Sequence, residues 1–158
     1  MERLKLFERL INAFDEGFVL AYKYDAVYHK YGDEVLYQTE MHLLQFVGKN
    51  PKTTATAIAM AMDKTVSACS QIIRKLRTKK LVEQIRNPEN NREYYLELTE
   101  LGWKVYAAHD DFENDCLKRT YHYLNEFSDE DLDTYIKVQK RLNEAFKLDV
   151  QENMINLS

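Results

Sequence analysis

The side chains best suited to chemistry lie in one stretch, TVSACSQIIRKLRTKK, at residues 65–80. Its first half carries hydroxyls and an amide that can hydrogen-bond to base edges, and its second half carries cations that suit phosphates. The residues expected to contact DNA here are Lys64, Thr65, Ser67, Ser70, Gln71, Arg74 and Lys75. The other face is apolar, which predicts an amphipathic helix that buries Val66, Cys69, Ile72, Ile73 and Leu76. Taken alone, the pattern also fits an ordinary surface helix.

Charge is divided unevenly along the chain, whose net charge is −4. Residues 49–92 hold ten basic and three acidic residues, a balance of +7, so the remainder holds 12 basic and 23 acidic residues, a balance of −11. Such a division favours one surface for phosphate on an otherwise acidic protein. A basic, solvated helix face is the alternative.

A second set of side chains has the spacing of metal ligands. His109, Glu113 and Cys116 are four and three residues apart, which places them on one face of a helix, and His42 on an earlier helix is a fourth donor. A histidine at a helix junction is, as the alternative, a structural hydrogen-bonding group. No Gly-rich phosphate loop, nucleophile elbow or His-x-x-x-His pair occurs, so we expect no enzymatic activity and no cofactor, with a bound zinc ion as the alternative.

Helices and one hairpin must position these groups. The first helix is predicted from near residue 2 to about Tyr31, ending at Gly32, with an apolar stripe suited to dimerisation: Leu4, Phe7, Ile11, Phe14, Phe18 and Ala21. Two short helices should follow, one capped by Thr39 and one by Thr53 or Thr54. The runs LVEQIR and REYYLELT, joined by NPENN, predict a β-hairpin with Arg92 beside its turn. Two long helices should close the chain, with caps at Thr99 and at Ser128 with Asp131.

The order of these elements, together with LYQTEMHLL, AIAMAM, TVSACSQIIRKL and RNPENNREYYLELTELG, resembles the MarR family of bacterial transcriptional regulators. The resemblance implies an α+β, mainly α fold. A winged helix-turn-helix would span residues 35–100, and the dimerisation helices would span residues 1–34 and 101–158, all within a single structural domain. It also implies a homodimer that binds a pseudo-palindromic operator in double-stranded DNA, commonly as a repressor, with Arg92 of the wing in the minor groove.

The resemblance has departures and leaves alternatives. Asn90 stands where an acid is usual in the wing and Asn91 where an arginine is frequent, and Lys79 with Lys80 replaces the common Lys-Gly after the recognition helix. Some zinc-sensing members have donors placed like His42, His109, Glu113 and Cys116, so a zinc-sensing regulator is one alternative. A winged-helix protein-interaction module without DNA binding is the other.

Many family members release DNA when a small aromatic ligand binds. A cluster of tyrosines fits such an effector pocket, although core and interface positions suit tyrosine equally. These residues are Tyr22, Tyr24, Tyr28, Tyr31 and Tyr37. Cys69 and Cys116 are expected to be reduced thiols, and no apolar run approaches the roughly 20 residues of a membrane span. We therefore expect a cytoplasmic protein with no membrane partner.

Overall fold

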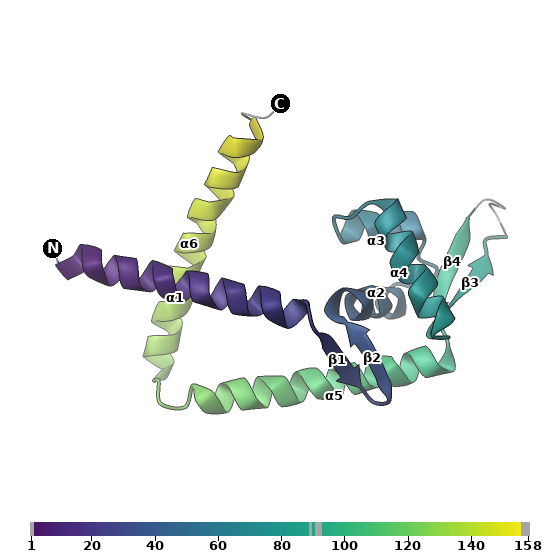
Figure 1. Cartoon of the computed structure of the whole chain (residues 1–158), viewed down its shortest axis with the longest axis horizontal. Helices are drawn as coiled ribbons and strands as arrows, with labels where there is room; N and C mark the ends of the chain where they lie inside the picture. The colour runs from purple at the N-terminus through teal and green to yellow at the C-terminus, as the bar shows by residue number, and fades with distance from the viewer. Residues whose placement is uncertain (1, 89, 91–92, 156–158) are drawn as a thin grey trace. The chain divides into compact units, whose positions relative to one another are not determined.

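The computed structural model describes residues 2–88, 90 and 93–155 of the 158-residue chain, with the side chains of its last helix to residue 152. The chain forms two compact units, Met1–Glu113 and Asn114–Ser158. Helices dominate both, and four short strands form two separate antiparallel hairpins in the first unit (Figure 1). The predicted mainly helical fold with a small β component is confirmed.

The chain begins with helix α1 (Glu2–Asp25), followed by a hairpin of strands β1 (Tyr28–Tyr31) and β2 (Glu34–Tyr37). The prediction that the first helix reaches Tyr31 is therefore wrong. Tyrosine and valine favour strands, and the pairing of Tyr31 with Glu34 leaves a two-residue loop whose first residue, Gly32, has φ +63°. The glycine adopts the left-handed conformation that we expected of it, but in a hairpin turn and not at a helix end.

Three short helices form the helix-turn-helix: α2 (Gln38–Lys49), α3 (Ala55–Ala61) and α4 (Val66–Thr78). The cap at Thr54 is confirmed, because its hydroxyl accepts a hydrogen bond from the Ala57 N–H at 3.2 Å. The cap predicted at Thr39 is wrong. The main-chain N–H of Tyr37 instead donates to the Glu40 carboxylate at 3.0 Å, so α2 begins one residue earlier than Thr39.

The second hairpin consists of strands β3 (Val82–Arg86) and β4 (Tyr94–Leu98), and it confirms the hairpin predicted from LVEQIR and REYYLELT. It extends beside α4 as a wing (Figure 1). The main-chain N–H of Leu96 donates to the Thr53 carbonyl at 2.9 Å, which ties the wing to the segment before α3.

The core of the first unit lies between α2, α3, α4 and the two hairpins. Its fully buried side chains are Tyr31, Leu36, Met41, Leu43, Leu44, Ile58, Cys69, Leu76, Leu81, Leu96 and His109. Cys69, Ile73 and Leu76 are buried as predicted, whereas Val66 is 46% exposed, because it occupies the first turn of α4 at the edge of the packed face.

Helix α5 (Glu100–Tyr123) begins in the first unit and ends in the second, which also contains α6 (Asp129–Ile155). Both predicted caps are confirmed. Thr99 Oγ1 accepts from the Gly102 N–H at 3.0 Å, and Ser128 and Asp131 exchange main-chain to side-chain hydrogen bonds of 3.0 and 3.2 Å. In the described part of the chain, every helix is too polar or too short to cross a membrane.

Candidate nucleic-acid interface and histidine cluster

Helix α4 presents a polar face to solvent. Ser67, Ser70, Gln71 and Arg74 are all exposed, and their three- and four-residue spacing places them on one side of the helix. The opposite side packs Cys69, Ile73 and Leu76 into the core. The structure therefore brings together, on a rigid helix, four of the residues predicted to contact DNA.

Two further predicted contacts, Lys64 and Thr65, lie at the start of this helix and are exposed. Thr65 is the N-cap of α4, since its hydroxyl accepts from the Ala68 N–H at 3.1 Å. The Lys64 N–H donates to the Ala59 carbonyl at 3.0 Å, which fixes the turn between α3 and α4. This turn places Lys64 directly before the N-cap of the helix that carries Ser67.

The seventh predicted contact on α4, Lys75, has an acidic partner that sequence reasoning missed. Its Nζ lies 3.6 Å from Glu40 Oε1, and the Glu40 side chain is only 6% exposed. One turn further on, Lys79 Nζ donates to the Val35 carbonyl at 2.7 Å and lies 3.6 Å from Glu34 Oε2. No sequence signal linked these residues, because the β1–β2 hairpin itself was not predicted.

Helix α4 ends on a lysine in the left-handed conformation, with φ +59° at Lys80. The Leu81 N–H donates to the Leu76 carbonyl and the Lys80 N–H to the Arg77 carbonyl, each at 2.9 Å. These two bonds form a Schellman motif, in which glycine is the usual residue at the position of Lys80. Helix α4 therefore ends in the usual motif without the usual glycine, and Lys80 adopts a strained backbone conformation to allow this.

The wing turn is closed by hydrogen bonds at its base. The Asn87 N–H donates to the Glu93 carbonyl at 3.1 Å, and the Glu93 N–H donates to the Asn90 carbonyl at 3.0 Å. Arg92, predicted to enter the minor groove, and its neighbour Asn91 lie outside the described residues. The role of Arg92 stays a prediction.

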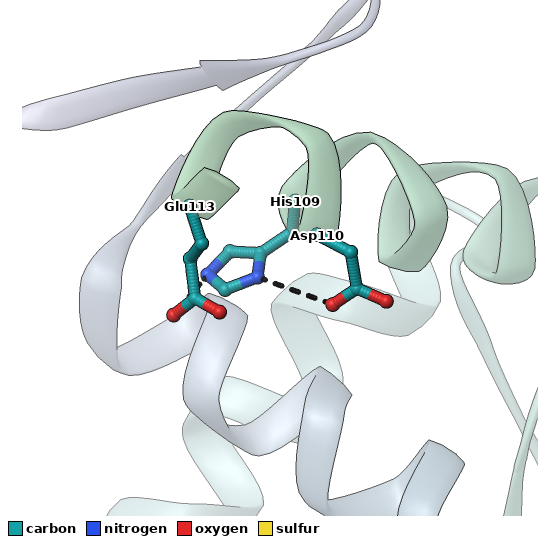
Figure 2. Close-up of side chains that lie close together, drawn as sticks. All are labelled: His109, Asp110 and Glu113. Atoms are coloured by element: carbon teal, nitrogen blue, oxygen red, sulfur yellow. Dashed lines mark ion pairs between the residues drawn. The ribbon is translucent and has the colours of Figure 1, made fainter. Parts of the chain in front are cut away.

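A cluster of one imidazole and two carboxylates lies on α5. Figure 2 shows the His109 ring between Glu113, 3.6 Å from its Nε2, and Asp110, 4.0 Å from its Nδ1. His109 is 1% exposed, and Gln45 Nε2 of α2 lies 3.1 Å from its Nδ1. Burial lowers the pKa of His109, although the two carboxylates act in the opposite direction.

The structure brings together only two of the four predicted metal donors, among the residues that it describes. His109 and Glu113 lie close to each other, and Asp110, which was not predicted although it follows His109 in the sequence, lies beside them. His42 is exposed, with its Nε2 3.1 Å from Gln38 Nε2, and it contributes slightly to the low pKa of His109. Cys116 belongs to the second unit, where its Sγ accepts from Arg119 Nη2 at 3.0 Å.

The tyrosines predicted to line an effector pocket take structural positions in three cases. Tyr31 is buried in the core, and the rings of Tyr28 and Tyr37 stack across the β1–β2 hairpin with centroids 3.8 Å apart. A groove of about 490 Å³ in the first unit has other side chains around it: Thr39, His42, Gln45, Phe46, Lys49, Ala61, Met62 and Lys64.

Comparison with known sequences finds similarity to transcriptional regulators. Residues 37–93 match the model of the MarR family. YhjH of Bacillus subtilis, named an HTH-type transcriptional regulator, is 28% identical over 97 residues, 61% of this chain and 55% of that protein. The chain thus matches little more than half the length of this curated relative.

Solved structures share the fold. FabT of Streptococcus pneumoniae, crystallised in complex with DNA, has a TM-score of 0.64 and 20% identity, covering 90% of this chain and 96% of its own. ZitR of Lactococcus lactis, described as a zinc-responsive MarR family member, has a TM-score of 0.72 and 19% identity, covering 89% and 99%. The expected winged helix-turn-helix fold is thereby confirmed.

Proposed function

We propose that the chain is a DNA-binding transcriptional regulator that acts as a cytoplasmic homodimer, as its match to the MarR family model over residues 37–93 and its similarity to YhjH suggest. The observation that carries the proposal is the exposed polar and basic face of α4, which stands on a core that buries the helix's other side. The proposed function has no enzymatic step, in agreement with the regulators that the chain resembles.

In the proposed complex, α4 enters the major groove with its N-terminal half against the bases. Ser67, Ser70 and Gln71 would read base edges, because hydroxyl and amide groups can donate and accept there. Lys64 and Arg74 would contact phosphates on either side, and Thr65 would hold the first turn of α4 in shape. We keep Arg92 as the proposed minor-groove contact of the wing.

Dimerisation would present two such helices to successive major grooves of a pseudo-palindromic operator. Supporting this, no side chain of α1 is buried, although the helix carries several large apolar residues. Those among them that are exposed include Leu4, Leu6, Phe7, Phe18 and Leu20. A second copy that covers this surface would remove it from water. Repression by occlusion of the promoter is the regulatory effect that we propose.

A fluorescence-anisotropy titration with genomic duplexes at several salt concentrations tests the DNA-binding function. We expect the logarithm of affinity to fall steeply and linearly with the logarithm of salt concentration, since lysines and arginines displace counterions from phosphates. A winged-helix module that binds only proteins has no DNA affinity at any salt concentration, and this result would remove the proposal.

We propose that the effector is a small aromatic molecule. The groove beside the turn between α3 and α4 supports a ligand near the recognition helix, because it includes Lys64 and combines apolar with cationic side chains. Calorimetric titration of aromatic carboxylates, followed by anisotropy in their presence, tests whether a ligand binds and whether it releases DNA.

Zinc sensing is the second candidate function, and the His109 cluster favours it. Two atoms that share a tetrahedral zinc ion lie roughly 3.4 Å apart, given metal–ligand distances of about 2.1 Å. The 3.6 Å between His109 Nε2 and Glu113 Oε1 fits this separation. On the other ring nitrogen, the Asp110 carboxylate faces Nδ1 and is placed to orient the imidazole by accepting its proton. His42 and Cys116 are the proposed remaining donors.

Metal analysis of the purified protein tests this candidate. We expect about one zinc ion per subunit and an operator affinity that changes when a chelator removes it. Protein that holds no metal, shows no thermal shift when zinc is added and binds DNA equally with chelator would exclude zinc sensing while leaving the DNA-binding function intact.

A further inference from the structure

The C-terminal half of α4 is bound to the β1–β2 hairpin. Lys79 reaches the hairpin from α4 and donates to the main-chain carbonyl of Val35 at 2.7 Å, with the Glu34 carboxylate 3.6 Å from the same ammonium group. Both charged side chains are about two-thirds covered, at 34% and 27% exposure. Lys79 thus links the end of α4 to Val35 of the hairpin, a residue 44 positions away in the sequence.

A second link lies one helical turn earlier, between Lys75 and Glu40. The Glu40 carboxylate uses one oxygen to accept from the Tyr37 N–H at 3.0 Å and places the other 3.6 Å from Lys75 Nζ. It therefore joins the end of β2, the first turn of α2 and the middle of α4. A carboxylate that is 6% exposed depends on such partners, because an unpaired buried charge is costly.

The hairpin is itself held in place. His29 Nε2 donates to the Tyr24 carbonyl at the end of α1 at 2.9 Å, and the rings of His29 and Tyr31 pack against Phe112 of α5, with centroids 5.9 and 5.4 Å apart. Tyr31 also donates its hydroxyl to Gln38 Oε1 at 3.0 Å. Lys79, the C-cap residue of α4, is thus bound to a hairpin that is itself anchored at α1, α2 and α5, whereas Lys75 reaches the end of this hairpin through Glu40 of α2.

The cations of this helix region consequently differ. Arg74 lies on the exposed polar face with Ser67 and Gln71, where a phosphate can approach. At Lys75 and Lys79 a carboxylate already faces the ammonium group, which reduces the attraction that the cation can offer to a phosphate.

We propose that Lys75 and Lys79 are positioning residues that set the orientation of α4, Lys75 on α2 through Glu40 and Lys79 on the β1–β2 hairpin, and that they are not phosphate contacts. The proposal rests on the proposed function, since the orientation matters because α4 reads DNA. Lys75, which the sequence pattern places among the DNA contacts, is therefore proposed as a positioning residue.

The test uses a duplex that the wild-type protein selects from a randomised 30-base-pair library, and a scrambled duplex of the same composition. Anisotropy across a salt series gives two quantities for each variant: the slope of log affinity against log salt, and the ratio of the two affinities. For Arg74→Gln we expect the slope to decrease by about one unit. For Lys75→Gln and Lys79→Gln we expect an unchanged slope and a ratio about fivefold lower.

A charge exchange separates orientation from loss of charge. Lys79→Glu should lower the affinity ratio, and adding Glu34→Lys should restore part of it, because the ion pair is re-formed with its signs reversed while the hydrogen bond to the Val35 carbonyl stays lost. Thermal unfolding of every variant confirms that it is folded. A slope decrease of one unit in Lys75→Gln and Lys79→Gln, or an unchanged affinity ratio in both, would overturn the proposal.

The link can also be tested without DNA, so its failure is distinguishable from failure of the proposed function. A double-mutant cycle on urea unfolding, with Glu34→Gln and Lys79→Gln, should give about a twofold to fivefold coupling in the unfolding equilibrium. If the wild-type protein selects no duplex, the proposed function is wrong and α4 has no DNA-reading role. The double-mutant cycle then still tests whether α4 is bound to the hairpin. A coupling within error would overturn the link itself.

Discussion

The carbonyl oxygen of Leu81 occupies the space that a Cβ atom on residue 102 would need, so Gly102 lets α5 approach the start of the wing. The same carbonyl accepts from the Thr99 N–H at 3.1 Å, and Thr99 Oγ1 in turn caps Gly102 at 3.0 Å. The sequence pattern Leu-Thr-x-x-Gly at residues 98–102 therefore describes one packed junction between the wing and α5.

Replacement of Gly102 by alanine should lower the free energy of unfolding by about 3 kcal/mol, because the new methyl group meets main-chain atoms that cannot move aside cheaply. The control is Gly17→Ala in α1, where the described residues place nothing within 4 Å of the new Cβ. That substitution should be neutral or stabilising by up to about 1 kcal/mol. Urea denaturation followed by circular dichroism measures both, and equal effects would contradict the steric explanation.

The sequence pattern and the structure differ at the β1–β2 hairpin, which follows α1. Apolar residues three and four positions apart correctly predicted α1, but the predicted helix extended to Tyr31, because aromatic residues continue the apolar pattern and no proline interrupts it. The Gly32-Asp33 pair forms the two-residue turn of this hairpin, and a glycine at this position is equally typical of a helix end. Local signals gave the wing and the caps at Thr54, Thr99 and Ser128, where the determining contacts lie within a few residues.

Helical periodicity predicted the part of the candidate DNA interface that lies on one helix, α4. Spacing alone placed Ser67, Ser70, Gln71 and Arg74 on one exposed face, since a single helix fixes their relationship. It could not separate Lys75 from Arg74, because the partner of Lys75 is Glu40, on a different helix. Contacts between elements depend on tertiary packing, which residue spacing within one helix does not encode.

Lys80 offers a test of stored backbone strain. Its φ of +59° is a conformation that costs a residue with a side chain about 1 kcal/mol and glycine nearly nothing. Lys80→Gly should therefore be about 1 kcal/mol more stable than Lys80→Ala, which loses the same charge but keeps the strain. Chemical denaturation of the two variants at matched pH and salt measures the difference. Equal stabilities would mean that the end of α4 tolerates the left-handed residue without strain.

The exposed apolar side chains of α1 predict the oligomeric state. At micromolar concentration, light scattering should give about twice the 18.8 kDa mass of one chain. Phe18→Glu, which places a charge among the exposed apolar residues, should shift the equilibrium toward monomer, whereas Lys5→Glu on the same helix serves as a control for added charge. A compact wild-type monomer would contradict the dimer and with it the binding of two operator half-sites.

Gln71 is the sharpest test of base reading, because its amide can donate and accept at the same base edge. Gln71→Ala should cost roughly 1–3 kcal/mol of binding free energy on the selected operator and little on a scrambled duplex. Thr78→Ala, near the end of the same helix, is a matched control, since the Thr78 hydroxyl already donates to the Arg74 carbonyl at 3.0 Å. Equal losses on both duplexes in Gln71→Ala would assign the glutamine to the phosphate backbone.

The buried His109 predicts how stability depends on pH. Burial lowers its pKa in the folded protein below the ordinary value of about 6.5 that it has in the unfolded chain. Above this value both states hold a neutral imidazole, and the stabilisation is fully present. As pH falls through the unfolded value, the unfolded chain binds the proton first, so stability must fall toward the lower folded value. Thermal unfolding from pH 8 to pH 5 should therefore show a decline to which His109 contributes.

His109→Gln should flatten this decline, because glutamine keeps a polar group near Gln45 but cannot take up a proton. His122→Gln, which removes an exposed imidazole from the same helix, should follow the wild-type profile. The carboxylates of Asp110 and Glu113 act against the effect of burial, so replacing Glu113 by glutamine should make the wild-type decline steeper. If His109→Gln and the wild type lose stability in parallel between pH 7 and pH 5, the imidazole is not held neutral in the folded protein, and the burial of its ring does not govern its protonation.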